Sequence, residues 1–215
     1  MDKFFSSWSG GKDSCLALYY AIKEGNKAAR LLTMLREDGE KSRSHGLNRK
    51  VLREQADSLN IPLETCSTSW DDYETNFIKI LSKFKKDGLK YGVFGDIDIQ
   101  EHREWVENVC SKVDMQALLP LWQQPRQQLL HDFISKGFKA LIVSVKEEDL
   151  DRKYLGNIIT EDLVKEFNRI GIDPAGENGE YHTVVIDGPI FSFPLAIKKG
   201  NILSHKGYCF LHTKI

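Results

Sequence analysis

Short runs of apolar residues recur along the first half of the chain. Each run is followed by a longer segment whose apolar residues repeat every three or four positions. The runs predict strands and the longer segments predict amphipathic helices. Strands are expected at 3–8, 29–35, 62–66, 91–96 and 115–121, and helices at 12–24, 46–59, 71–86 and 99–112. Alternation at this spacing predicts a parallel sheet with right-handed crossovers, which is an α/β fold.

The pattern changes near Pro120. A helix is expected at 125–136, a strong strand at 139–145 and a helix at 160–169, after which the chain becomes rich in glycine and proline and β-like. We therefore predict a first α/β domain over residues 1–118. A smaller α+β lobe over residues 119–215 is expected to fold over it.

Composition narrows the classes of function. The chain has 215 residues, an ordinary apolar fraction of 41% and a net charge of −1. The near-zero charge gives no basic field to attract nucleic acid or an anionic membrane. No apolar stretch approaches the roughly 20 residues that span a bilayer, and the four widely spaced cysteines are typical of reduced thiols. We expect a cytoplasmic protein without a nucleic-acid or membrane partner.

The hexapeptide at 9–14 follows the first predicted strand and opens the first predicted helix. Its residues are Ser9, Gly10, Gly11, Lys12, Asp13 and Ser14. A Walker loop needs a glycine six residues before the lysine and Ser or Thr directly after it, whereas this chain has Ser6 and Asp13 there. The adjacent glycines also exclude the dinucleotide fingerprint.

The same hexapeptide nevertheless has the properties of an anion site. Glycines allow close approach of the backbone, and a helix N-terminus offers unpaired N–H groups. Lys12 adds charge and the two serines add hydroxyl groups. Asp13 fits if Mg²⁺ arrives with the phosphates, and it is our candidate metal ligand. A tight turn before an N-capped helix is the plain alternative, but the complete hexapeptide favours a nucleotide site.

The SGGKDS hexapeptide closely resembles the loop of the ATP pyrophosphatases of the PP-loop type. Other segments resemble the diphthine–ammonia ligase family within that superfamily, in order along most of the chain. They are HGLN with His45 and Asn48, GDIDIQEHREW with Gly95 and Arg103, LPLW, GFKALIVSV, LDRKYLG and GENGEYHTVVIDGPIF. The resemblance implies a Rossmann-like PP-loop domain that binds ATP through residues 9–14, with His45 and Gly95 nearby. It also implies adenylation of a carboxylate and amidation by ammonia, with AMP and pyrophosphate as products.

The chain departs from the family pattern on the acceptor side. Asn178 stands where a glycine is typical, and His182 stands where an acidic residue is expected. These departures resemble a bacterial branch that has been proposed to act in cobalamin salvage. The acceptor is therefore open: a small-molecule or protein-borne carboxylate. Corrinoid salvage and nucleotide binding without turnover remain alternatives, and a homodimer is possible.

The remaining site candidates lie in two segments. Glu177 and Glu180 can orient ammonium or accept protons, and His182 can act as a base, so with Lys12 they are our catalytic candidates. The plain alternatives are a solvated turn for the carboxylates and an ordinary strand histidine for His182. Asp96, Arg103, Asn178 and Gly179 are candidates for binding the acceptor. Trp70, like most tryptophans, is expected to pack.

Overall fold

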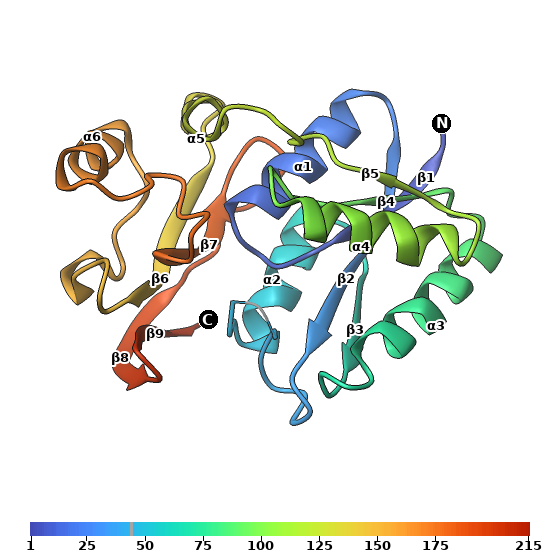
Figure 1. Cartoon of the computed structure of the whole chain (residues 1–215), viewed down its shortest axis with the longest axis horizontal. Helices are drawn as coiled ribbons and strands as arrows, with labels where there is room; N and C mark the ends of the chain where they lie inside the picture. Colours follow the sequence, from blue (N-terminus) through green and yellow to red (C-terminus); the bar gives the residue numbers. More distant parts are fainter. Residues whose placement is uncertain (44) are drawn as a thin grey trace.

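The computed structural model describes residues 1–43 and 45–215. Its first lobe is built on a parallel sheet with the order β3-β2-β1-β4-β5, which confirms the predicted α/β fold (Figure 1). The elements of this lobe are β1 (Lys3–Ser7), α1 (Lys12–Lys23), β2 (Lys27–Leu35), α2 (Arg49–Leu59), β3 (Leu63–Ser67), α3 (Tyr73–Lys86), β4 (Tyr91–Val93), α4 (Gln100–Ser111) and β5 (Gln116–Leu118). The strand order reverses between β1 and β4, and the crevice at such a switch point is the usual ligand site of open α/β sheets.

Two strands are shorter than the apolar runs suggested. The run at 91–96 forms a strand only to Val93, and the run at 115–121 forms one only over Gln116–Leu118. Pro120 cannot donate a ladder hydrogen bond, which limits the second run. Gly95 turns the chain toward the start of α1, because a Cβ placed on it would lie 2.8 Å from the backbone nitrogen of Ser14.

Alternate residues of the strands face two hydrophobic clusters, as expected for a sheet covered on both faces. Phe5 lies in a cluster with Phe77 and Phe84 of α3. Phe4 lies in the other cluster, which contains residues of α1 and α2. That second cluster continues through Phe133 into the second lobe, so the two lobes share one core.

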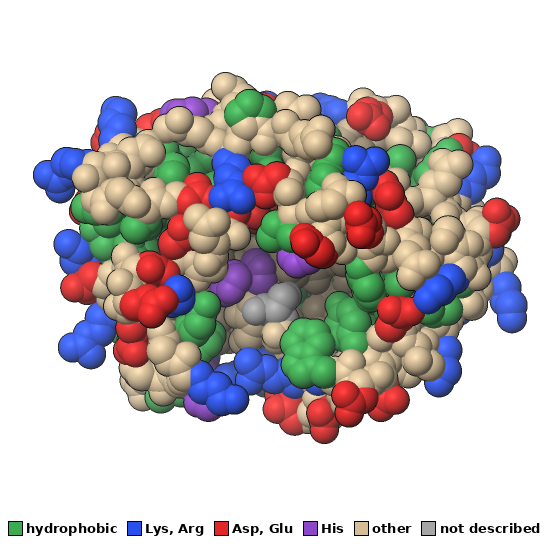
Figure 2. Space-filling model, viewed as in Figure 1, with side chains coloured by type: hydrophobic (Ala, Val, Ile, Leu, Met, Phe, Trp, Pro, Cys, Tyr) green, Lys and Arg blue, Asp and Glu red, His purple; other side chains and the backbone are tan. Residues whose placement is uncertain are grey.

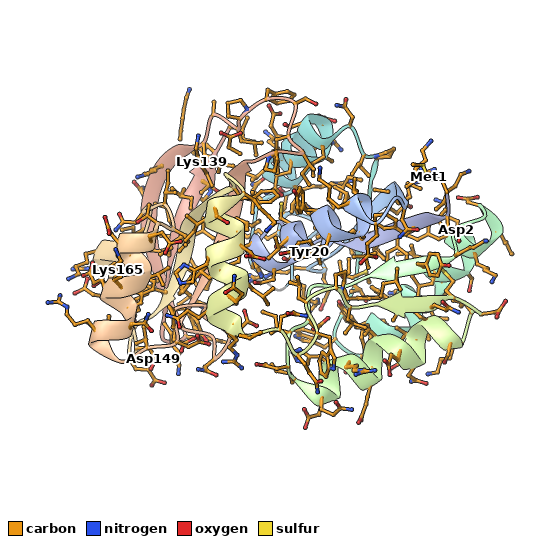
Figure 3. All side chains as sticks on the ribbon, turned by 90° about the horizontal axis from the view of Figure 1, so that it is seen from above. Met1, Asp2, Tyr20, Lys139, Asp149 and Lys165 are labelled. Atoms are coloured by element: carbon orange, nitrogen blue, oxygen red, sulfur yellow. The ribbon has the colours of Figure 1, made fainter. Side chains whose placement is uncertain are left out.

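The second lobe is a four-stranded antiparallel arrangement with the order β7-β6-β9-β8. Its elements are α5 (Arg126–Ser135), β6 (Lys139–Lys146), the 3₁₀ turn η1 (Arg152–Tyr154), α6 (Glu161–Ile170), β7 (Tyr181–Asp187), β8 (Lys198–His205) and β9 (Tyr208–Lys214). Seen from above, the lobes stand side by side with Tyr20 of α1 between them (Figure 3). The Tyr20 hydroxyl donates to Asp132 of α5 over 2.6 Å.

Gln55 of α2 joins three parts of the structure at one buried point. Its side-chain oxygen accepts from the indole N–H of Trp8 over 3.0 Å. Its amide nitrogen donates to the carbonyl oxygens of Gly10 and Val185 over 2.9 and 2.7 Å. The backbone N–H of Val185 also donates to the carbonyl oxygen of Gly10, over 2.9 Å. One fully buried side chain therefore ties Trp8 directly after β1, Gly10 of the following loop and Val185 of β7 together.

None of the helices in the described part of the chain is both long and apolar enough to cross a membrane.

We predict that Gln55→Leu lowers the free energy of unfolding by about 2–4 kcal/mol, because the indole N–H of Trp8 and the carbonyl oxygen of Val185 lose their buried side-chain partner, and the carbonyl oxygen of Gly10 keeps only the N–H of Val185. Urea denaturation measures this difference. Gln127→Leu, at an exposed position of α5, is the matched control and should change stability by less than about 0.5 kcal/mol. Equal stabilities for the two variants would contradict the role given to Gln55.

Candidate active site

The loop formed by residues 9–14, called the phosphate loop below, connects the end of β1 to the start of α1. Gly10 has φ +82°, and a Cβ on it would lie 2.7 Å from Gln55 Oε1, so this position requires glycine. A Cβ on Gly11 would overlap the imidazole ring of His45. Gly11 is also the N-cap of α1, and it gives the helix no side-chain cap. The helix end therefore presents its positive dipole to the crevice, which suits phosphate.

Lys12 lies at the base of this loop between two carboxylates. Its ammonium nitrogen is 2.8 Å from an oxygen of Asp13 and 3.2 Å from an oxygen of Glu177. Burial of the ammonium acts to lower the pKa of Lys12, but the two carboxylates outweigh it and the pKa lies above its ordinary value. Lys12 therefore stays charged.

Glu177 belongs to a loop of the second lobe, residues 173–180, which we call the acidic loop. Burial, reinforced by the charge of Asp13, raises the pKa of Glu177 above its ordinary value despite the nearby Lys12. A carboxyl group whose pKa is raised toward neutrality is suited to proton transfer. The acidic loop thus faces the phosphate loop across the cleft.

Glu180 was expected to be a catalytic residue, but its side chain lies away from the cleft. It is 5% exposed, and its oxygens accept from the backbone N–H groups of Asp173 and Asn178 and from the Asn178 side chain. Glu180 is not among the residues that line the cleft between the two loops. Its observed contacts hold the acidic loop closed, whereas Glu177 is the carboxylate that points to Lys12.

The rings of His45 and His182 lie against each other in the cleft, with centroids 4.6 Å apart and ring planes inclined by 30°. Nδ1 of His45 lies 3.2 Å from the carbonyl oxygen of Thr183. Burial lowers the pKa of His45 to about 4 and that of His182 to about 3, and the nearby Lys12 acts in the same direction on both. Both imidazoles are therefore neutral at neutral pH.

Gly95 and Asp96 enter the cleft from the segment after β4. Burial raises the pKa of Asp96, against the effect of His102, whose Nδ1 is 3.2 Å from an Asp96 oxygen. Gly179 also lines the cleft. The ends of β1 and β4 thus contribute residues to one site.

Two acceptor candidates lie outside the cleft lining. Arg103 pairs with Glu107 over 2.7 Å on α4, and its guanidinium lies 5.0 Å from the ring centroid of Trp122. Asn178 faces away toward Arg126, 3.3 Å from its guanidinium. Arg103 lies in the segment expected after β4 and Asn178 lies in the expected glycine-rich loop. Sequence spacing places these residues along the chain but does not tell which way their side chains point.

Trp70 was expected to pack and instead is 70% exposed at the cleft. Its ring is 4.5 Å from the guanidinium carbon of Arg43 and 5.6 Å from the ring of Tyr73. These residues adjoin Thr33 and Met34 at the end of β2. An aromatic and cationic wall of this kind suits a flat, electron-rich ring. The short segment before α3 carries no motif that would have revealed it.

Together these residues surround a cleft of about 380 Å³ between the lobes. Figure 2 shows a hollow at this place, with histidine side chains gathered inside it. One side of the cleft is the phosphate loop and the opposite side is the acidic loop. The volume and the mixture of cationic, acidic and aromatic groups suit a nucleotide.

The parallel sheet, the phosphate loop at its switch point and the second lobe define a two-lobed α/β protein with an anion-binding loop at the carboxyl ends of its strands. The chain belongs to the diphthamide synthase family: the model of the family's N-terminal domain matches residues 2–117, and that of its C-terminal domain matches residues 125–215.

Relatives from several eukaryotes are named diphthine–ammonia ligase. The Schizosaccharomyces pombe protein is 29% identical over 96% of this chain, and the chain spans only 38% of its length. The Mus musculus protein is 28% identical over 94% of this chain and 85% of its own length. A solved structure described as a predicted subunit of tRNA methyltransferase from Methanocaldococcus jannaschii covers 87% of this chain and 98% of its own at 15% identity. Its TM-score of 0.46 is too low to indicate more than a loose likeness.

We predict that the histidine pair makes stability depend on pH. The unfolded histidines bind protons below pH 6.5 or so, while the folded ones stay neutral to about pH 4, so stability falls as pH decreases through this window. Between about pH 7 and pH 5 each histidine should cost on the order of 1–2 kcal/mol. Urea denaturation of wild type and of the His45→Asn, His182→Asn double variant measures this cost.

His205→Asn, a substitution of an exposed histidine on β8, is the matched control. If wild type and the double variant lose equal stability between the two pH values, the histidines are not held neutral by burial.

Proposed function

We propose that the protein is an ATP-dependent, AMP-forming ligase that adenylates a carboxylate and amidates it with ammonia. The 3.2 Å contact between Lys12 and Glu177 carries this proposal. It puts a phosphate-binding cation and an acidic loop from the other lobe in one cleft, as a reaction that joins a nucleotide, an acceptor and an amine requires. The names of the relatives support the same reaction class.

ATP is a substrate of this reaction, and the cleft suggests its orientation. The phosphate loop offers Lys12, two serine hydroxyl groups and the start of α1 to the β- and γ-phosphates. The wall with Trp70 and Arg43 is left for adenosine. The α-phosphate then lies between them and is open to attack, with pyrophosphate as the held leaving group.

The charges around Lys12 indicate what binding would change. The Lys12 ammonium pairs with both Asp13 and Glu177. Phosphate oxygens would compete for the same ammonium, which releases Glu177 to face the nitrogen donor. A carboxylate there attracts ammonium and can take up a proton.

Asp13 and the hydroxyl groups of Ser9 and Ser14 fit a Mg²⁺ ion that arrives with ATP, since Mg²⁺ typically takes one or two carboxylates together with phosphate oxygens and water. Within the described residues, no group of three or more His, Cys, Asp or Glu side chains that could hold a metal ion occurs. Such an ion would neutralise phosphate charge. Asp13, 28% exposed in its side chain, is the residue placed to hold it.

The proposed reaction has two steps, adenylation of the carboxylate and amidation by ammonia. A carboxylate oxygen of the acceptor bonds to the α-phosphorus while the bond to the β-phosphate oxygen breaks, giving an acyl adenylate and pyrophosphate. Ammonia then bonds to the acyl carbon, AMP leaves with the bonding electrons, and the nitrogen loses a proton. Glu177 is our candidate acceptor of that proton, and the neutral rings of His45 and His182 are polar acceptors that can orient the nitrogen.

We predict that Lys12→Ala weakens ATP binding by about 1.5–3 kcal/mol, because the variant loses a charged hydrogen bond to phosphate and leaves Asp13 and Glu177 to repel it. Isothermal titration calorimetry with Mg²⁺ and ATP measures the change. Lys23→Ala removes the same charge at the far end of α1 and should bind like wild type. Unchanged affinity in Lys12→Ala would remove the basis for the phosphate loop.

We also predict that ATP labelled on its α-phosphate yields AMP in the presence of ammonium chloride and a panel of carboxylates. Glu177→Gln should keep ATP affinity within a few-fold and lower AMP formation by roughly a hundredfold, the usual scale for loss of an acid–base group. Glu148→Gln, an exposed carboxylate in the second lobe, is the control. Labelled ADP as the main product would indicate a kinase or ATPase instead.

A further inference from the structure

A second cavity, of about 410 Å³, borders the cleft at His45. Its walls are Arg36 and Lys41, residues 45–48, the β8–β9 hairpin and Val143 of β6. His45 is the one residue in the described part of the chain that lines both this cavity and the cleft. In the proposed reaction ATP and Glu177 lie in the cleft, and neither occupies the second cavity.

The lining of the second cavity is basic. Arg36 and Lys41 contribute from one wall, and His205 and His212 contribute from the hairpin. Among the described residues that line it, none is acidic, whereas the cleft is lined by Asp13, Asp96 and Glu177. A cavity with cations and without carboxylates selects an anion.

The same cavity has an apolar part. Phe210, Leu211 and Leu47 line it with Leu203, which is 56% exposed on β8. A small inorganic anion would leave these side chains unused. The matching ligand is an organic anion with an apolar body, for which the volume is sufficient.

His45 connects the second cavity to the reacting atoms. Its ring packs so closely on Gly11 that a Cβ there would overlap it, and Nδ1 is 3.2 Å from the carbonyl oxygen of Thr183. Because the His45 ring lies against Gly11 and also lines the second cavity, that cavity adjoins the phosphate loop at this ring.

We propose that the second cavity is the acceptor site: it binds an organic carboxylate with an apolar body and presents the carboxyl group past His45 to the α-phosphate. This inference rests on the proposed function. The step that it serves is the first one above, in which the carboxylate oxygen bonds to the α-phosphorus and pyrophosphate leaves. Arg36 and Lys41 hold or guide the acceptor and take no part in the bond changes.

Hexanoate and hexylamine are suitable probes, because they share an apolar chain and differ in the sign of charge. In ¹⁵N NMR titrations, hexanoate should shift the amide signals of Gly46, Leu47, Phe210 and Leu211, and hexylamine should not. The Arg36→Ala, Lys41→Ala double variant should bind hexanoate at least about tenfold more weakly, as expected for loss of charged contacts. The Lys79→Ala, Lys86→Ala double variant removes the same charge from the exposed face of α3 and should bind as wild type does.

A titration with saturating α,β-methylene-ATP separates this inference from the proposed function. Hexanoate should still bind, because the two ligands occupy different cavities. Competition between them, shifts confined to the cleft, or an equal response to hexylamine would overturn the acceptor site while leaving the nucleotide site intact. Failure of ATP to bind or to yield AMP would instead overturn the proposed function. If the double variant does not fold, Lys41→Gln and the comparison of the two probes on wild type give the same decision.

Discussion

The buried amide of Gln55 is the contact on which the arrangement of the site depends. Gln55 lies on α2, which is amphipathic, and it occupies one position on the buried face of that helix. In the structure its single side chain satisfies Trp8, Gly10 and Val185 at once. A buried polar group without partners costs more than its hydrogen bonds return, so the three segments are stable together and each is poorly satisfied alone. Because one segment leads into the phosphate loop and another is β7, this amide sets the position of the second lobe against the first.

Charge balance in the cleft follows from that position. With β7 held against Gly10, the acidic loop that precedes β7 brings Glu177 to Lys12, and the strand brings His182 to His45. Lys12 is 8% exposed in its side chain, which would be costly for an unpaired ammonium. Asp13 and Glu177 supply the opposite charge that this buried ammonium requires. Phosphate oxygens carry charge of the same sign as the carboxylates, so Lys12 can exchange from a carboxylate to a phosphate.

Most of the fold could be predicted from the sequence, because strands and helices are indicated by the local pattern of apolar residues. Apolar runs and amphipathic stretches locate nearly every element of the first lobe. The hexapeptide SGGKDS marks the phosphate loop, because positions 10 and 11 have no room for a side chain and require glycine. The direction in which a side chain points is not determined by the local sequence alone. Glu177 and Glu180 are three residues apart in one loop, yet one reaches Lys12 and the other bonds to the loop backbone, a difference set by φ +88° at Gly179 and by the contacts of the loop. Arg103 pairs along its own helix, and Trp70 reaches the cleft from a short connection without a motif.

The central claim is that one nucleotide is held by both lobes. Hydrogen–deuterium exchange with and without α,β-methylene-ATP tests it most directly, because it reports on each backbone segment separately. The account predicts slower exchange in the nucleotide complex both at residues 9–14 and at residues 176–183, since the acidic loop and the start of β7 line the same cleft as the phosphate loop. Protection confined to the first lobe, with exchange at 176–183 unchanged, would contradict it.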